Sequence, residues 1–279
     1  MIRSAPLAAA LLSLLPTLAA ADCAGTPGPC LVETGEYHVV LPDSPAADPM
    51  PAVMYLHGAG ASGATAITNS GLIGALTARG YAVIAPTGSR AFGGPDGHLW
   101  AFRDSFPGRD EAAFLGAVMD DASDRFGIDP DHTLLAGFSA GGFMVSYLAC
   151  ATPDAFPAYA PLSGGFWRPH PDSCAGPVRL HQTHGWSDTT VPLEGRYLGG
   201  GKWQQGDIFA GMEIWRHAND CPTETADTFD TTGPFWRRSW TACADGSALE
   251  LALFPGGHMI PPGWADMALD WFEKVVPRN

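Results

Sequence analysis

The chain has 279 residues, of which 46% are hydrophobic and only 16% are charged. This composition excludes a disordered chain and is typical of a globule with a large apolar core. The formal net charge is −14, whereas binding to nucleic acid or to an anionic membrane surface needs clustered lysines and arginines, which this chain lacks. We therefore expect no nucleic-acid partner and no membrane partner for the mature protein.

The first residues have the pattern of a secretory signal peptide. Arg3 precedes an apolar run over residues 5–18, and the alanines at 19–21 satisfy the small-residue rule for cleavage. The run is too short and too interrupted by proline for a good membrane span, and no later segment reaches the length that a bilayer requires. We predict a signal peptide over residues 1–21, a single domain over residues 22–279, and a monomer secreted to the extracellular space or the periplasm.

Six cysteines form an even set in a chain that we expect in an oxidising compartment. Fifteen pairings are possible. Proximity in the sequence suggests three short loops, closed by Cys23–Cys30, Cys150–Cys174 and Cys221–Cys243. A metal site is the alternative, but no pair has C-x2-C spacing with histidines nearby, so we predict no bound metal.

Apolar runs alternate with amphipathic stretches along the chain, as in α/β proteins. The patterns predict, in order, strands at 36–41 and 52–56, a helix at 65–79, a strand at 81–85, a helix at 110–126, a strand at 133–136, a helix at 142–149, strands at 155–162 and 178–183, a helix at 207–217, a hairpin within 221–243, a strand at 248–254 and a helix at 264–275. The long loop at 88–108 is rich in glycine, proline and aromatic residues.

The pentapeptide Gly137-Phe138-Ser139-Ala140-Gly141 lies where a buried strand ends and a small-residue helix begins. This G-x-S-x-G pattern is typical of a nucleophile elbow, in which small residues on both sides of the serine let strand and helix pack closely. The alternative is a tight turn with a capping serine. The strand-then-helix context favours Ser139 as a nucleophile.

Two further side chains lie just past the ends of strands. Asp188 follows the strand at 178–183, and His258 lies in a glycine-rich loop after the strand at 248–254. Together with Ser139, they give the chain order serine, acid, base, which distinguishes one group of triad enzymes from the other serine protease folds. The other carboxylates of the interval, none of which follows so clear a strand, are Asp172, Asp207, Asp220, Asp227 and Asp230.

With these motifs the chain resembles the secreted polyhydroxybutyrate depolymerase and feruloyl esterase group of α/β-hydrolases. The segments that carry the resemblance are His57-Gly58-Ala59-Gly60, Gly137 to Gly142, His184 to Asp188 with Val191-Pro192, and Gly256-Gly257-His258. They span nearly the whole mature chain. The resemblance implies an α/β-hydrolase fold with a mostly parallel central sheet flanked by helices on both faces.

The resemblance also implies acyl transfer without a metal or an organic cofactor. Ser139 would attack an ester carbonyl, His258 would act as the base, and Asp188 would orient the imidazolium. The oxyanion hole would use the backbone amides of Ala59 and Ala140. Gly60 is the alternative to Ala59.

The substrate itself is open at this level. The loop at 88–108 follows a strand end, so it predicts one wall of a substrate cleft with Trp100 as the first contact, unless its rings only fasten the loop to the core. Trp186 and Trp264 are further candidates for contact, and the helical spacing around Trp264 favours a core position. We expect hydrolysis of a polyhydroxybutyrate-type polyester or its oligomers, with a feruloyl, hydroxycinnamoyl or acetylxylan ester as the alternative. A catalytically inactive binding protein is the alternative of another class, and the intact serine, acid and base argue against it.

Overall fold

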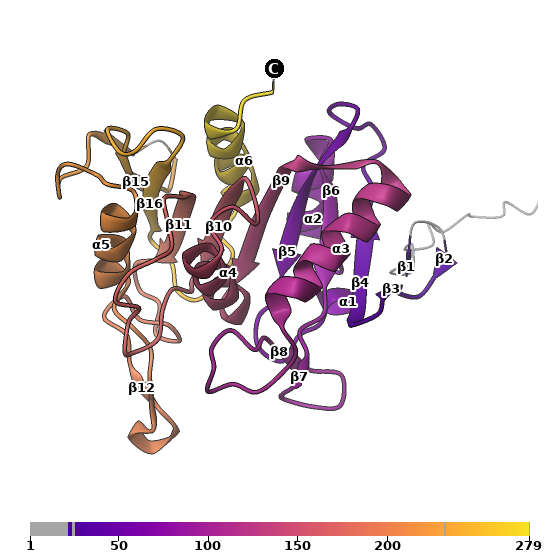
Figure 1. Ribbon diagram of the computed structural model, residues 1–279, viewed down its shortest axis with the longest axis horizontal. Coiled ribbons are helices and arrows are strands. Elements are labelled where there is room, and N and C mark those ends of the chain that lie inside the picture. Colours follow the sequence, from indigo (N-terminus) through magenta and orange to yellow (C-terminus); the bar gives the residue numbers. More distant parts are fainter. Residues whose placement is uncertain (1–21, 24–25, 232, 279) are drawn as a thin grey trace, which may run out of the picture.

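The computed structural model describes residues 22–23, 26–231 and 233–278 (Figure 1), so the predicted signal peptide lies outside the described residues. One large sheet has the strand order β14-β15-β16-β11-β10-β9-β5-β6-β4-β1-β2, and β3 pairs with β4. Its centre, from β16 to β6, is parallel throughout, while β15 and β4 join the two sides of this centre in the antiparallel sense. The central sheet confirms the predicted α/β architecture.

The strands of this sheet are β1 (Asp22–Cys23), β2 (Thr26–Pro27), β3 (Cys30–Val32), β4 (Gly35–Val40), β5 (Met50–Leu56), β6 (Ala82–Pro86), β9 (Ile128–Phe138), β10 (Ala158–Leu162), β11 (Arg179–Gly185), β14 (Thr228–Asp230), β15 (Trp236–Trp240) and β16 (Ala248–Phe254). The helices are α1 (Gly63–Ala66), α2 (Ser70–Ala78), α3 (Glu111–Phe126), α4 (Ala140–Ala151), α5 (Ile208–Ala218) and α6 (Trp264–Val275). Two short hairpins, β7 (Arg90–Ala91) with β8 (His98–Leu99) and β12 (Tyr197–Leu198) with β13 (Trp203–Gln204), lie at the same edge of the sheet, and the 3-10 turn η1 (Gly199–Gly201) joins the second pair (Figure 1).

Both faces of the sheet are covered, and this explains why its central strands are apolar without alternation. Every residue of β5, β6 and β10 is buried. Along β5, Met54 belongs to the same buried cluster as side chains of α3, α4 and α5, whereas its neighbours Val53 and Tyr55 belong to the cluster that includes α2 and α6. The sheet is therefore the middle of three layers, and its strand ends are free to carry polar side chains.

The expected helix at 65–79 is the clearest difference between the predicted and the observed elements. It is divided into α1 and α2 because two polar side chains cap separate helix starts. Ser62 and Thr65 form a capping box at α1, and Asn69 accepts a hydrogen bond from the Leu72 amide at the start of α2. The helix after the elbow begins at Ala140, two residues before the expected position.

The cysteines pair as Cys23–Cys30, Cys150–Cys174 and Cys221–Cys243, as proximity in the sequence suggests. The third bond closes a segment that contains the β14–β15 hairpin. Disulfides of this kind fit an oxidising compartment. None of the helices within residues 22–278 that the structure describes has the length and apolar character needed to cross a membrane.

Candidate active site

Ser139 occupies a sharp turn between β9 and α4. Its backbone has φ 57° and ψ −114°, in the positive-φ region that residues other than glycine rarely adopt. Close packing around the turn requires glycine, since a Cβ on Gly141 would lie 2.0 Å from the carbonyl oxygen of Leu56, and one on Gly137 would lie 2.5 Å from that of Gly141. The turn therefore has the geometry of a nucleophile elbow, with the serine at the carboxyl edge of the sheet.

A chain of hydrogen bonds joins the three residues that the sequence pattern singled out. His258 Nε2 lies 2.9 Å from Ser139 Oγ, and His258 Nδ1 lies 2.7 Å from Asp188 Oδ2. Asp188 Oδ1 accepts hydrogen bonds from the amides of Thr190 and Val191, at 2.9 and 2.8 Å. Burial alone would raise the pKa of Asp188, but the hydrogen bonds from His258 and the Val191 amide hold it below its ordinary value. Asp188 is therefore ionised, so Nδ1 of His258 carries a proton and Nε2 is free to accept one from Ser139.

The loops that carry Asp188 and His258 are docked on one another. They leave the neighbouring parallel strands β11 and β16 at the paired residues Gly185 and Phe254. The Trp186 amide donates to the Phe254 carbonyl at 2.8 Å, and the Ser187 amide donates to the Gly256 carbonyl at 2.9 Å. A Cβ on Gly185 would lie 2.3 Å from the carbonyl oxygen of Gly257, so this close approach depends on glycine.

A second histidine lies beside Asp188, and we did not assign it a role from the sequence. His184 is fully buried, its Nε2 donates to the Val191 carbonyl at 2.8 Å, and the same nitrogen lies 3.7 Å from Asp188 Oδ2. Burial lowers the pKa of His184 and keeps its ring neutral. His184 thus holds the turn that presents Asp188. Its place in a buried strand gives it the pattern of a core residue, and only its spacing of four from Asp188 pointed to the site.

The candidate oxyanion donors lie around the same space as the serine. Ala59, Ser139 and Ala140 all line one cavity. Ala140 is the first residue of α4, so its amide precedes the first internal hydrogen bond of the helix and faces no helical acceptor. The Gly60 amide, by contrast, donates to the His98 carbonyl at 2.9 Å. Gly60, the alternative to Ala59, is therefore already engaged in a hydrogen bond.

A neutral histidine fixes the loop that carries Ala59. His57 Nε2 accepts a hydrogen bond from the Gly88 amide at 3.0 Å, so the ring proton is on Nδ1, which donates to the Gly58 carbonyl at 2.8 Å. Burial lowers the pKa of His57 to about 4. The Trp100 indole nitrogen donates to the His57 carbonyl at 2.9 Å, and this ring is completely buried.

The tryptophans expected to contact substrate are therefore corrected in two cases. Trp100 supports the His57 loop from within the core and has no exposed surface. Trp264 is 1% exposed and donates its indole N–H to Thr183 Oγ1 at 3.2 Å, so it too belongs to the core. Trp186 is 58% exposed and packs edge-on against Trp236, with ring centres 6.0 Å apart, but it is not among the residues that line the cavity.

The cavity in front of Ser139 has a volume of about 620 Å³. The loop at 88–108 forms one wall with Phe92, Phe102 and Phe106, as the sequence predicted for this loop. A second wall, which the sequence did not indicate, comes from the segment around β12 and β13 and includes Trp203. Phe106 packs edge-on against Trp203, with ring centres 5.3 Å apart. The space is mostly apolar, with a few polar groups, as ligand sites usually are.

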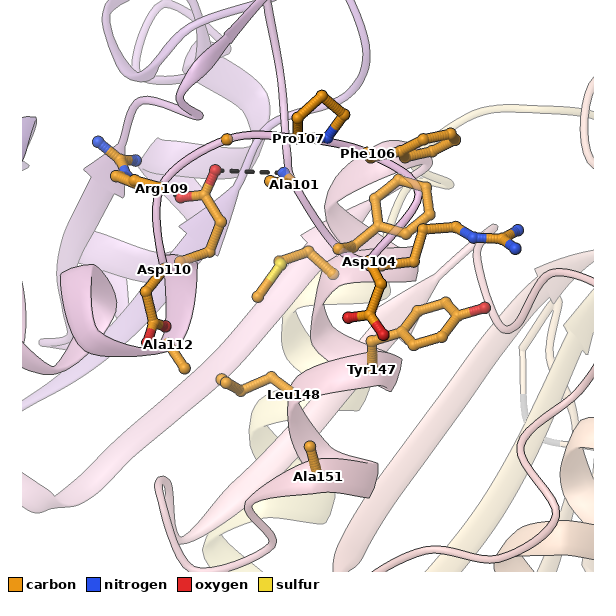
Figure 2. Close-up of a pocket in the computed structure, with 15 residues that line it drawn as sticks. Ala101, Asp104, Phe106, Pro107, Arg109, Asp110, Ala112, Tyr147, Leu148 and Ala151 are labelled. Atoms are coloured by element: carbon orange, nitrogen blue, oxygen red, sulfur yellow. Dashed lines mark hydrogen bonds and ion pairs between the residues drawn. The ribbon is translucent and has the colours of Figure 1, made fainter.

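A second pocket, of about 470 Å³, is also lined by Phe102 and Phe106 but not by Ser139. Figure 2 shows the residues that line it. In Figure 2, Tyr147, Leu148 and Ala151 project from α4 toward the loop that forms the cavity wall. Buried Glu111 holds this loop, because it accepts hydrogen bonds from the Ser89 and Ala101 amides and pairs with Arg109 at 2.8 Å. This pocket therefore reflects how the loop is anchored. Within the described residues, no group of histidine, cysteine and acidic side chains is arranged to hold a metal.

Residues 35–175, about half of the chain, match the family model described as Esterase PHB depolymerase. The chain belongs to this family. The matched region contains the Ala59 loop and the Ser139 elbow, while Asp188 and His258 lie beyond it.

Curated relatives of this chain include feruloyl esterase C of Emericella nidulans, which is 28% identical over 153 residues, or 53% of this chain and 50% of that protein. Poly(3-hydroxyalkanoate) depolymerase C of Paucimonas lemoignei is 36% identical over 58 residues, or 21% of this chain and 14% of that protein. The chain thus spans about half, or less, of the length of these relatives.

Among solved structures, an acetyl xylan esterase from Aspergillus awamori has a TM-score of 0.61 at 14% identity and covers 85% of this chain and 93% of that chain. A carboxylesterase from Bacillus cereus has a TM-score of 0.56 at 12% identity, with 86% and 94% covered. These likenesses show the shared α/β-hydrolase fold.

Proposed function

We propose that this protein is a secreted serine esterase that hydrolyses carboxylic esters through an acyl-enzyme. The observation that carries the proposal is the hydrogen-bonded chain from Ser139 through His258 to buried Asp188, at the wall of an apolar cavity. Family membership supports the reaction class. The three disulfides support export to the extracellular space or the periplasm.

The reaction follows from the proton positions in the site. His258 Nε2 removes the proton of Ser139 as its Oγ attacks the ester carbonyl, and the imidazolium then gives this proton to the departing alcohol. The carboxylate of Asp188 stabilises the imidazolium. The amides of Ala59 and Ala140 donate to the oxyanion of the tetrahedral intermediate. Water, activated by the same imidazole, releases the acid.

The substrate class that we favour is a polyhydroxybutyrate-type polyester or its oligomers. The matched family and the name of the Paucimonas lemoignei relative support it, and the apolar cavity suits an aliphatic chain. The second candidate is a feruloyl or related plant cell-wall ester, supported by the name of the Emericella nidulans relative and by the aromatic walls at Phe106 and Trp203.

A serine-directed fluorophosphonate probe tests the reaction class. Wild type should be labelled, and Ser139→Ala should not. Ser105→Ala is the matched control, because Ser105 lines the same cavity without a histidine partner among the described residues. Its labelling should equal that of wild type. Turnover should fall in Ser139→Ala by a factor on the order of 10⁶, the size found in the best-studied triad enzyme. Labelling of folded Ser139→Ala would overturn the assignment.

Initial rates on three substrates separate the candidate classes. Serine-dependent release of 3-hydroxybutyrate from its oligomers or from amorphous polyhydroxybutyrate would support the polyester reading, and the ratio of the two rates would rank oligomer against polymer. A preference for methyl ferulate would instead assign the protein to plant cell-wall esters. No labelling and no turnover by folded wild type would favour a binding protein.

A further inference from the structure

We propose that the cavity selects esters that carry a carboxylate in addition to the ester group, and that Arg90 and Arg196 bind this carboxylate. The inference rests on the proposed function and adds a substrate property to it. A hydroxy acid esterified at its hydroxyl is a substrate of this kind, because its own carboxylate stays free. Hydrolysis breaks the bond between the acyl carbon and the alcohol oxygen, consumes one water, and leaves the carboxylate on the hydroxy acid.

The charge of the cavity differs in sign from that of the whole protein. The chain has 29 acidic residues and 15 lysines and arginines. Among the described residues that line the cavity, however, are two arginines, Arg90 and Arg196, and no aspartate or glutamate. An apolar cavity with only positive side chains attracts an anionic ligand more strongly than an exposed site does, since the surrounding medium screens the charges less.

Arg90 has hydrogen-bonding capacity that the protein leaves unused. Its guanidinium lies over Phe106, with the central carbon 4.7 Å from the ring centre. Its Nη1 atom is buried and has no hydrogen-bond acceptor among the described residues. No carboxylate in the described part of the chain lies within ion-pair distance of it.

Arg109, directly after the same loop, is an arginine whose guanidinium has a full set of hydrogen-bond acceptors. Arg109 also lies over a ring, with its guanidinium carbon 3.2 Å from the centre of Phe114. In addition, Arg109 pairs with Glu111 at 2.8 Å and donates to the carbonyls of Thr34 and Thr87. Ring contact therefore accompanies a full set of acceptors at Arg109, whereas Nη1 of Arg90 has no acceptor among the described residues.

Arg196 brings a second guanidinium from the other wall segment. It precedes β12, and its backbone carbonyl accepts a hydrogen bond from the Gln205 amide at 2.9 Å, which fixes the base of the hairpin. Its side chain makes one hydrogen bond in the described structure, from Nε to Gln205 Oε1 at 3.3 Å. The terminal nitrogens remain available, and a guanidinium offers them in the planar arrangement that matches a carboxylate.

Paired substrates that differ only in this charge test the inference. For a carboxylate on the alcohol side, the comparison is 3-butyryloxybutyrate against its methyl ester, with the rate measured as butyrate release. For a carboxylate on the acyl side, the comparison is monomethyl glutarate against dimethyl glutarate, with the rate measured as methanol release. We expect wild type to favour the charged member of at least one pair by about tenfold or more in kcat/KM, as for a hydrogen bond to a charged group. The pair that shows the preference identifies the side of the ester on which the carboxylate binds.

Variants assign the preference to the two arginines. Arg90→Gln and Arg196→Gln should each lower the ratio of charged to neutral substrate, and the double variant should bring it to about one or below. Arg90→Lys keeps the charge without the planar fork and should retain part of the ratio. Arg238→Gln is the matched control, because Arg238 is exposed on β15 outside the cavity, and it should leave both rates unchanged.

The outcomes are separable from those of the proposed function. Serine-dependent turnover with a neutral substrate favoured in both pairs, or a ratio that survives the double variant, would overturn the inference and leave the esterase assignment intact. Absence of serine-dependent turnover and of fluorophosphonate labelling would instead overturn the esterase assignment. Labelling of each arginine variant shows that it is folded with a competent Ser139. If a glutamine variant is not labelled, Arg90→Lys and Arg196→Lys take its place.

Discussion

Replacement of Asp188 by asparagine tests the proton positions in the site without removing the side chain. Oδ1 accepts from the Thr190 and Val191 amides, so the oxygen of the new side chain must stay at this position. Its NH₂ group then takes the place of Oδ2, which lies 2.7 Å from Nδ1 of His258. Two donors would face each other, and the imidazole would have to carry its proton on Nε2. In this tautomer, it cannot accept the proton of Ser139.

We expect kcat/KM to fall by about 10⁴, as in the best-studied enzyme with this substitution, which corresponds to about 5 kcal/mol in the activation free energy. The free energy of unfolding should change by only about 1 kcal/mol, since both backbone hydrogen bonds persist. The assays are initial rates on a neutral activated ester and unfolding in urea.

Asp227→Asn is the matched control, because Asp227 likewise accepts from two consecutive amides, those of Thr241 and Ala242, at 2.6 and 3.1 Å, but lies in an exposed turn. Its activity should equal that of wild type. If Asp188→Asn kept more than a tenth of the wild-type rate, the role given to the carboxylate would be wrong.

Other predictions concern stability. Burial lowers the pKa of His57 to about 4, so the unfolded chain binds one proton more than the folded protein between pH 6.5 and 4. The free energy of unfolding should therefore fall by up to about 3 kcal/mol as the pH drops through this range. In His57→Gln, this part of the pH dependence, measured in urea, should flatten, and an unchanged slope would contradict it. Gly141→Ala would place a Cβ 2.0 Å from a backbone oxygen and should lower the free energy of unfolding by about 3 kcal/mol. Gly116→Ala, with open space around the new Cβ, should instead stabilise α3 by about 1 kcal/mol. Equal midpoints of thermal unfolding in the two variants would refute this contrast. Replacing Cys150 and Cys174 by serine opens a loop with a sequence separation of 24 and should lower the free energy of unfolding by about 3 kcal/mol. A loss of less than about 1 kcal/mol would contradict this and show that packing holds the loop.

The residues of the candidate site could be predicted because each one lies at the end of a strand with a local signature. In a parallel sheet, strand ends meet at one edge, so Ser139, Asp188 and His258 needed only a correct strand assignment to be brought together. The glycines beside them, such as Gly185, indicated close backbone approach before the partner backbone was known.

The errors concern positions where a specific contact, and not the local sequence pattern, decides the outcome. Trp100 lies in a glycine-rich loop after a strand end, where we expected a substrate contact, but its indole N–H is satisfied by the His57 carbonyl, 43 residues away in the chain. The wall around Trp203 comes from a segment without a helical or alternating pattern, so no helix or strand could be predicted there. The break between α1 and α2 was missed because Asn69 lies within an otherwise helical pattern, and its capping contact outweighs that pattern.

The docking of β16 beside β11 has a consequence for how the protein acquires activity. The contact between Ser139 and His258 spans 119 residues of sequence, and that between Asp188 and His258 spans 70. Contacts of such separation form late in folding, because a long loop must close before they contribute. During refolding, hydrolytic activity should therefore return after the tryptophan fluorescence of the core, and its rate reports the arrival of the final strand at the sheet.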